Sequence, residues 1–298
     1  MRLKVSVVIR TLNEEKYLSE LLSSINSQVC DFDVEVVLID SGSTDSTVLI
    51  AEEFSANVTY IDKKDFTFGR SLNEGCRFAT GEIFVLISGH CVPCSEFWLS
   101  DLCAPIIESE VGYTYGRQQG RDTTNFSEER LFAKYYLDEN KIPQRGYFVN
   151  NANSAIARAV WEKFLFDENI LGLEDMELAK RYTATGGKLG YVASAAVYHI
   201  HDESWGQIKR RYEREAIALR QIWPEVKLPL HAAIRYFVVA IVSDLYQAFK
   251  LRVLCRNVLS ILQFRSAQYW GAVIGSNRNE RLNALQRESY FYPRRIKS

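Results

Sequence analysis

The sequence has 298 residues, of which 47% are hydrophobic, and its 36 Lys and Arg side chains nearly balance 37 Asp and Glu. A chain of this length and apolar content can bury a large core, which argues against general disorder and leaves room for one large α/β domain with an appendage. A formal net charge of −1 gives no indication of a nucleic-acid partner, and we expect none.

The charge is unevenly distributed along the chain. Residues 1–205 carry 19 basic and 31 acidic side chains, whereas residues 206–298 carry 17 basic and 6 acidic ones. We therefore predict an acidic body over residues 1–205 and a basic, helical C-terminal extension over residues 206–298. A basic and aromatic extension is typical of a segment that contacts an anionic membrane surface. A solvated basic face is the alternative.

The six cysteines are scattered, and no signal-peptide pattern precedes the first predicted strand. This distribution favours a reduced, cytoplasmic setting over a disulfide framework. Cys91 and Cys94 have the spacing of half a zinc site or a redox pair. No second Cys or His pair follows at the usual spacing, so we interpret them as buried or idle thiols.

The first 90 residues alternate between predicted strands and helices. Strands are predicted over Val5–Ile9, Val34–Ile39, Val58–Ile61 and Ile83–Ile87. One helix is predicted directly after the first strand, a second over Ser46–Phe54 and a third over Gly69–Ala79. Such alternation implies crossover connections and a mainly parallel sheet flanked by helices. Ligands bind outside the carboxyl ends of the strands in such sheets. Those ends carry Thr11, Asp40, Asp65 and the segment Ser88-Gly89-His90.

The later part of the chain is predicted to be α+β and then helical. We expect a strand at Val111–Gly116, a helix at Glu128–Glu139, short strands near Asn153–Ala157, a helix at Met176–Thr185, and an almost wholly helical chain from Trp205. Residues 231–249 are mostly apolar, but Arg235 and Asp244 interrupt them. We therefore favour an interfacial helix over a membrane-spanning one, with packing against the rest of the chain as the alternative.

Two common nucleotide-binding motifs are missing from the sequence. It contains no Gly-x-Gly-x-x-Gly after the first strand and no Gly-x-x-x-x-Gly-Lys-Ser/Thr, which argues against a dinucleotide oxidoreductase and a P-loop NTPase. Asp40 and Asp45 are placed to accept hydrogen bonds from a pyrimidine base and a ribose hydroxyl. Alternatively, Asp40 forms a turn and Asp45 caps the next helix.

Three segments together resemble a known family. These are the run from Val5 through Thr11-Leu-Asn13-Glu14, the turn Asp40-Ser41-Gly-Ser-Thr-Asp45, and the segment Asp65-Phe-Thr-Phe-Gly-Arg70-Ser-Leu-Asn73. The chain resembles, from residue 3 to about residue 205, the family 2 glycosyltransferases with the GT-A (Rossmann-like) fold, especially their rhamnosyltransferase-like branch. The resemblance implies a mixed, mainly parallel sheet with a C-terminal helical extension. It also implies a nucleotide-sugar site formed by Thr11, Asn13, Glu14, Asp40, Ser41, Arg70, Asn73, Ser88, Gly89 and His90.

The family places an Asp-x-Asp type motif at the end of the fourth strand, where its carboxylates hold Mn²⁺ or Mg²⁺ against the diphosphate. This sequence has Ser88-Gly89-His90 at that place. One interpretation is an imidazole site in which His90 meets His199 and His201, two residues that strand alternation would put on one face. Another is metal-free stabilisation of the leaving group by arginines and a protonated His90. A third is a hydrogen-bonded, structural His90.

Glu174 and Asp175 match the family's acidic pair on the acceptor side. An inverting transfer needs one carboxylate to remove the proton of the acceptor hydroxyl as that oxygen attacks the anomeric carbon. The resemblance implies that Asp175 is the base and that Glu174 orients the acceptor or supports the loop. An acidic pair that opens a helix is also ordinary capping chemistry, which is the alternative.

These observations predict an inverting transfer of rhamnose or a similar sugar from a dTDP- or UDP-sugar donor to a hydroxyl of a lipid-linked or surface polysaccharide. We expect the protein to be cytoplasmic and peripheral on the inner face of the cell membrane. A non-catalytic nucleotide-sugar-binding or scaffold subunit is the alternative, motivated by Ser88 and His90 in place of carboxylates. A nucleotidyltransferase on a related sheet is a third hypothesis.

Overall fold

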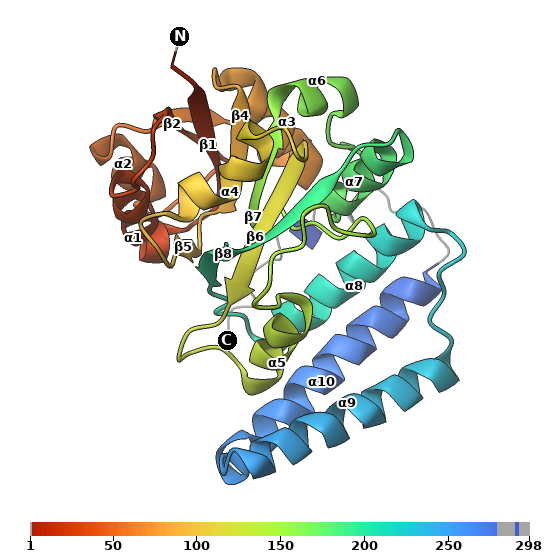
Figure 1. The fold of residues 1–298 in the computed structure, drawn as a ribbon. Helices are drawn as coiled ribbons and strands as arrows, with labels where there is room; N and C mark the ends of the chain where they lie inside the picture. The colour runs from red at the N-terminus through yellow and green to blue at the C-terminus, as the bar shows by residue number, and fades with distance from the viewer. Residues whose placement is uncertain (1, 279–289, 292–298) are drawn as a thin grey trace. The chain divides into compact units, whose positions relative to one another are not determined.

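The computed structural model describes residues 2–278 and 290–291, and the chain divides into two compact units (Figure 1). The first unit consists of Met1–Arg121, Tyr136–Asn169 and Glu174–Ile200, and the second of Asp122–Tyr135, Ile170–Leu173 and His201–Ser298. The boundary expected after residue 205 has its counterpart near Ile200. The second unit also takes in two short, earlier segments that the sequence did not indicate.

The first unit is built on a mixed sheet with the strand order β3-β2-β1-β4-β7-β6-β8-β5. The strands are β1 Lys4–Thr11, β2 Asp33–Asp40, β3 Asn57–Tyr60, β4 Ile83–Ser88, β5 Cys91–Pro93, β6 Tyr113–Gln119, β7 Asn153–Ala157 and β8 Leu189–His199. β3, β2, β1 and β4 are parallel, whereas β7 is antiparallel to both of its neighbours. The predicted mixed, mainly parallel sheet is confirmed.

Helices on both faces of this sheet connect its strands. They are α1 Glu15–Asn26, α2 Thr47–Glu53, α3 Phe68–Phe78, α4 Trp98–Ile107, α6 Arg158–Phe164 and α7 Glu174–Ala184, with a short 3₁₀ helix at Lys63–Asp65. The predicted helices of this unit agree with α1, α2, α3 and α7 to within a few residues. β5, β8, α4 and α6 were not predicted.

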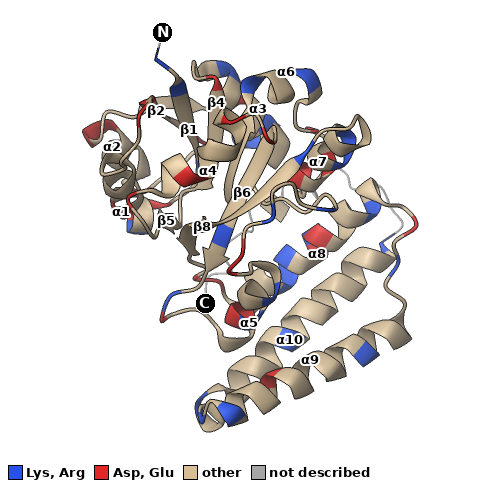
Figure 2. Cartoon of the chain, viewed as in Figure 1, with Lys and Arg blue, Asp and Glu red and all other residues tan. Residues whose placement is uncertain are grey.

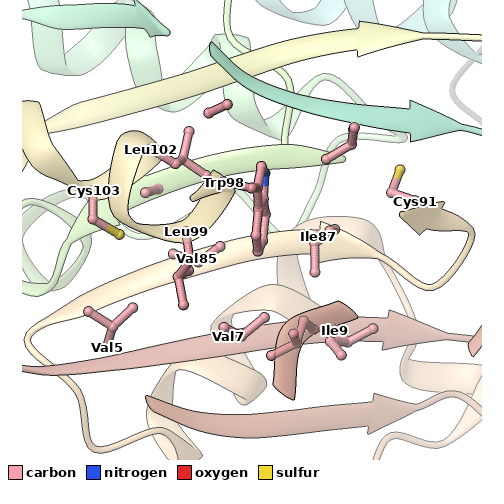
Figure 3. Packing of buried hydrophobic residues seen from close by; sticks show 14 of the residues in the cluster. Val5, Val7, Ile9, Val85, Ile87, Cys91, Trp98, Leu99, Leu102 and Cys103 are labelled. Carbon is pink, nitrogen blue, oxygen red and sulfur yellow. The ribbon is translucent and has the colours of Figure 1, made fainter. Parts of the chain in front are cut away.

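Successive side chains of β1 are buried on opposite faces of the sheet. Val5, Val7 and Ile9 are fully buried in one cluster with α1 and α4, in which Trp98 lies among strand side chains (Figure 3). The Trp98 indole N–H donates to Asn153 Oδ1 over 2.9 Å, so its polar edge is satisfied. Val8 points to the opposite face, where a Cβ on Gly75 of α3 would lie 2.5 Å from it. Because side chains pack on both faces of the sheet, the ends of its strands are held in fixed positions.

The second unit is helical and consists of α5 Phe126–Tyr135, α8 Trp205–Ile222, α9 Leu230–Lys250 and α10 Leu254–Asn277 (Figure 1). The helical nature predicted for the chain after Trp205 is confirmed for the described residues, and the helix predicted at Glu128–Glu139 ends earlier, at Tyr135. Two glycines bring α10 against α8. A Cβ on Gly271 would lie 2.2 Å from the Lys209 carbonyl oxygen, and one on Gly275 would lie 2.2 Å from that of Glu213.

We expect Gly271→Ala to destabilise the second unit by about 1–3 kcal/mol, because the added methyl group forces the two helix backbones apart. The matched control is Gly206→Ala in α8, where the nearest atom to the new Cβ is 3.8 Å away. This control should stabilise the helix by up to about 1 kcal/mol. Urea unfolding followed by circular dichroism measures both changes, and equal effects at the two glycines would contradict the close packing.

α9 is long and apolar enough to cross a membrane, with a mean hydropathy of 1.3 over its best window. Its one acidic residue, Asp244, is only 2% exposed and accepts a hydrogen bond from Arg265 Nε of α10 over 2.8 Å. The opposite surface of α9 exposes Val239, Val242 and Phe249 to solvent. Of the two residues that interrupt the apolar run, Arg235 is exposed and Asp244 is buried. Figure 2 shows both charge types on α9.

Candidate active site

The carboxyl ends of β1 and β2 are joined by hydrogen bonds between predicted site residues. Thr11 Oγ1 donates to Asp40 Oδ1 over 3.4 Å, and Ser41 donates to the Thr11 carbonyl through both its N–H and its hydroxyl at 3.1 Å. Asp40 Oδ2 also accepts from the N–H groups of Gly42 and Ser43 at 2.8 and 2.9 Å. Asp40 thus shapes the turn after β2, as the turn-forming alternative expects, and Thr11, Asp40 and Ser41 lie together at this edge.

Asn13 and Glu14 connect the loop after β1 to the loop after β2. Asn13 has a φ of 57° and its Oδ1 accepts from Thr44 N over 2.8 Å, a common role for asparagine in the left-handed region. The Glu14 N–H donates to Thr47 Oγ1 over 2.8 Å. Asp45 accepts from Thr47 N over 3.0 Å just before α2, whose N-cap residue is Ser46, so Asp45 stabilises the turn into this helix and is not its N-cap.

The segment after β4 packs directly on these residues. The Gly89 N–H donates to the Arg10 carbonyl over 3.3 Å, and a Cβ on Gly89 would lie 2.8 Å from Glu14 Cγ. His90 Nδ1 lies 2.8 Å from Glu14 Oε1. Ser88 pairs with Arg10 in the β1–β4 register. Because any side chain at residue 89 would collide with Glu14, the glycine is required for this contact.

His90 is stacked on His199, with ring centroids 5.1 Å apart and ring planes at 20°. Ring nitrogens of the two lie within 4.8 Å of each other, and His199 Nδ1 is 2.7 Å from Gln118 Oε1. Metal-binding imidazoles commonly have a carboxylate, carbonyl or water on the nitrogen that does not bind the ion. Glu14 and Gln118 supply that kind of partner, so His90 and His199 fit a divalent ion that accepts nitrogen ligands.

His201 belongs to the second unit. β8 ends at His199, so His201 lies just beyond the strand on which alternation was expected to place it. His201 Nδ1 lies 2.8 Å from Glu128 Oε1, the same oxygen that accepts a hydrogen bond from Arg211 over 2.7 Å. Its role as a metal ligand stays a prediction.

The acidic pair opens α7 and is tied to the end of β1. Arg10 Nη1 lies 3.3 Å from Glu174 Oε1, and both side chains are largely buried. Arg10 also lies over the Phe68 ring, 4.8 Å from its centroid. Since the Arg10 backbone pairs with Ser88 and binds Gly89, this one residue connects the acidic pair to the edge that carries the other predicted site residues. Arg10 was not among the predicted site residues, although a charged side chain at the end of a buried strand was a visible signal.

Asp175 is 7% exposed and is held by backbone donors. Its Oδ2 accepts from Asn151 N over 3.0 Å and its Oδ1 from Met176 N over 2.7 Å. Burial, with a contribution from the negative charge of Glu174, raises the pKa of Asp175 to about 7, against the lowering effect of these hydrogen bonds. A carboxyl group with a pKa near neutrality can accept a proton readily at physiological pH.

Asn151 is a second residue that the sequence analysis missed. Its Oδ1 accepts hydrogen bonds from the hydroxyl groups of Tyr113 and, over 2.9 Å, Ser154. Its buried Nδ2 has no hydrogen-bond partner among the described residues. Buried polar atoms are rarely left without a partner, so this amide beside Asp175 is a candidate donor to a substrate oxygen.

Arg70 and Asn73 lie on α3 and contact Glu168. Arg70 Nε donates to Glu168 Oε2 over 2.9 Å. Asn73 Nδ2 donates to the Phe166 carbonyl and to Glu168 Oε1, each over 2.9 Å, while its Oδ1 accepts from Trp161 and from Phe166 N. The hydrogen-bonding capacity of Asn73 is fully used within the protein. Its predicted contact with a nucleotide therefore stays a prediction without support from the geometry.

A pocket of about 470 Å³ opens beside the turn after β2. It is lined by Gly42, Ile61, Asp62, Lys63 and Lys64. Gly42 has a φ of 93°, which favours glycine and lets the turn curve around this pocket. The two lysines were not predicted as site residues, and their charge suits a phosphate-bearing ligand.

Comparison with known proteins identifies the same family as the sequence motifs. Residues 6–165 match the family described as "Glycosyl transferase family 2". The chain is 25% identical over 223 residues to the O-antigen chain rhamnosyltransferase RfbN of Salmonella typhimurium, covering 70% of each chain. It is 27% identical over 190 residues to the O-antigen chain rhamnosyltransferase WbaN of Salmonella anatum, covering 60% of each. The predicted family is confirmed, and both relatives are named as rhamnosyltransferases, in agreement with the branch that the motifs resemble.

A solved structure shares the fold. The mannosyltransferase PcManGT from Pyrobaculum calidifontis, in complex with GDP-Man and Mn²⁺, superposes with a TM-score of 0.64 at 17% identity, covering 94% of this chain and 89% of that one. At this level of identity the likeness establishes the fold, and it confirms the predicted GT-A architecture.

Proposed function

Since the chain belongs to glycosyl transferase family 2 and is a glycosyltransferase, we propose that it transfers rhamnose or a similar sugar with inversion of the anomeric centre. The donor is a dTDP- or UDP-sugar, and the acceptor is a hydroxyl of a lipid-linked or surface polysaccharide. The observation that carries this proposal is the buried pair Glu174 and Asp175, tied through Arg10 to the edge where β1, β2 and β4 end. The relatives named as O-antigen chain rhamnosyltransferases support the choice of sugar and acceptor class.

In this mechanism Asp175 removes the proton of the acceptor hydroxyl. The oxygen then forms a bond to the anomeric carbon while the bond from that carbon to the diphosphate oxygen breaks on the opposite face. The raised pKa of Asp175 suits a base, and the Arg10 guanidinium balances the charge of Glu174 beside it. Asn151 Nδ2 would donate to the acceptor.

On the donor side, Thr11, Asn13, Glu14, Asp40 and Ser41 would hold the base and ribose, with Arg70, Ser88, Gly89 and His90 toward the diphosphate. His90 and His199 would hold a divalent ion that accepts nitrogen ligands, such as Mn²⁺, and this ion would supply charge neutralisation for the departing nucleoside diphosphate. Support for this assignment comes from the contacts among these residues at one edge of the sheet.

For the second unit, we propose contact with the inner face of the cell membrane. Support comes from the exposed apolar surface of α9 and from the excess of basic over acidic side chains after residue 205. A glycosyltransferase held there would meet a lipid-linked acceptor at the surface to which that acceptor is anchored.

A donor panel tests the proposed function. The full chain is incubated with UDP-, dTDP- and GDP-sugars, and release of nucleoside diphosphate is measured in chelator and after Mn²⁺ or Mg²⁺ is added back. We expect release from dTDP-rhamnose that falls on chelation and returns with metal. Full activity in excess chelator would reject the histidine site. Pyrophosphate as the product would identify a nucleotidyltransferase, and no release from any donor would contradict the proposal.

The pH dependence of transfer tests the base. Asp175 must be ionised to accept a proton, so the rate should fall about tenfold per pH unit below its pKa of about 7 and level off above it. The profile of kcat/KM between pH 5 and 9 measures this, with Asp175→Glu expected to move the midpoint. A flat profile down to pH 5 would show that Asp175 does not titrate as the base.

A further inference from the structure

The second unit contains a groove of about 850 Å³ bounded by α8, α9 and α10. The α9 wall is a helical stripe that includes Leu230, Ile234 and Phe237, and the α10 wall includes Leu262 and Trp270. This volume falls in the range of about 300–1,000 Å³ typical of sites for small molecules. The groove is thus large enough for a ligand and is lined mainly by apolar side chains.

The walls of the groove are also unusually exposed. Leu230 is 61% and Trp270 62% exposed, although both are large apolar side chains. Contiguous apolar surface of this kind marks an interaction site in most soluble proteins. The same helix presents Val239, Val242 and Phe249 on a surface outside the groove. α9 therefore presents apolar side chains both in the groove and on its outer surface.

The charge on the lining of the groove and the exposed charges on α9 and the start of α10 are all positive. Lys209 is the only charged side chain among the described residues that line it. Between residues 230 and 278 the single acidic residue is Asp244, which is buried against Arg265. The exposed charges of α9, of the turn after it and of the start of α10 are Arg235, Lys250, Arg252 and Arg256. A ligand that complements this surface combines an apolar chain with an anionic group.

We propose that this groove binds the hydrocarbon chain of an isoprenoid phosphate, with the Lys209 ammonium group beside the phosphate. A lysine is a common partner for phosphate, to which it offers a compact positive charge. The aromatic and branched side chains of the walls cover a branched hydrocarbon by dispersion contacts. The inference rests on the proposed function for the glycan part of the ligand, because the isoprenoid phosphate would be the membrane anchor of the acceptor.

The test is equilibrium binding of farnesyl phosphate to the full chain, with farnesol and inorganic phosphate as comparison ligands. Ser266 lines the groove and is exposed, so Ser266→Trp fills the groove without entering the core. The matched control is Ser243→Trp, an exposed serine of α9 outside the groove. We expect Ser266→Trp to weaken farnesyl phosphate binding at least tenfold, about 1.4 kcal/mol, and Ser243→Trp to leave it within about twofold.

Lys209→Gln supplies a second variant that does not depend on filling the groove. It should weaken binding of farnesyl phosphate to the level of farnesol and leave farnesol binding unchanged. Equal weakening by Ser266→Trp and Ser243→Trp, or no loss in Lys209→Gln, would overturn the proposal. Donor turnover is measured separately on the unaltered chain. Farnesyl phosphate binding without turnover of any donor would reject the proposed function and leave the groove assignment standing, and the reverse result would reject only the groove.

Discussion

Asp175→Asn is expected to lower the rate of sugar transfer by about 10²- to 10⁴-fold, the range that a positioned general base contributes. The amide cannot take up the proton of the acceptor hydroxyl, while its volume is close to that of the carboxyl group. Donor binding should change little, because Asp175 contacts Asn151 and the start of α7 rather than the loops after β1 and β2. Transfer rates at saturating donor, together with the donor dissociation constant, separate these two effects.

The structure offers a matched control for this substitution. Asp101→Asn makes the same chemical change in the first turn of α4, where Asp101 is half-buried rather than buried. It should keep activity within a factor of about two, as surface changes away from a site usually do. Thermal unfolding of both variants checks that the fold survives, since one backbone N–H beside residue 175 loses its acceptor. Unchanged transfer in Asp175→Asn would reject this residue as the base.

The strands and helices of the first 90 residues were predictable because local patterns determine them. The buried residues of α1 are Leu18, Leu21, Leu22 and Ile25, which are the positions that helical spacing indicated. The four parallel strands follow from β-branched runs that are separated by helices. β8 escaped prediction because three alanines and one glycine among its 11 residues weaken its strand signal, which pairing with β5 and β6 reinforces.

Contacts between distant residues explain what the sequence did not reveal about the site. Arg10 and Glu174 are 164 residues apart, so no local pattern indicates that they meet. Asn73 shows the opposite case, because its motif position suggested a ligand contact whereas the fold uses its amide to hold the Phe166 backbone. The stacking of His90 on His199 depends on the pairing of β5 with β8, and β5 is too short to predict.

The second large effect is expected in the helical unit. Arg265→Met should destabilise that unit by about 3–5 kcal/mol, because the carboxylate of Asp244 would stay buried without its positive partner. Arg256→Met, an exposed position on the same helix, is the control and should change stability by less than about 0.5 kcal/mol. Urea unfolding followed by circular dichroism gives both values.

The double variant Asp244→Asn/Arg265→Met distinguishes charge from packing. It removes the buried charge and keeps an oxygen that can accept from the Ser127 hydroxyl, which lies 2.7 Å from Asp244 in the protein. Since replacing a buried ion pair with neutral groups is often nearly neutral for stability, most of the loss should be recovered. A double variant as unstable as Arg265→Met would show that packing volume sets the cost. Recovery would show that the unpaired buried carboxylate sets the cost in Arg265→Met.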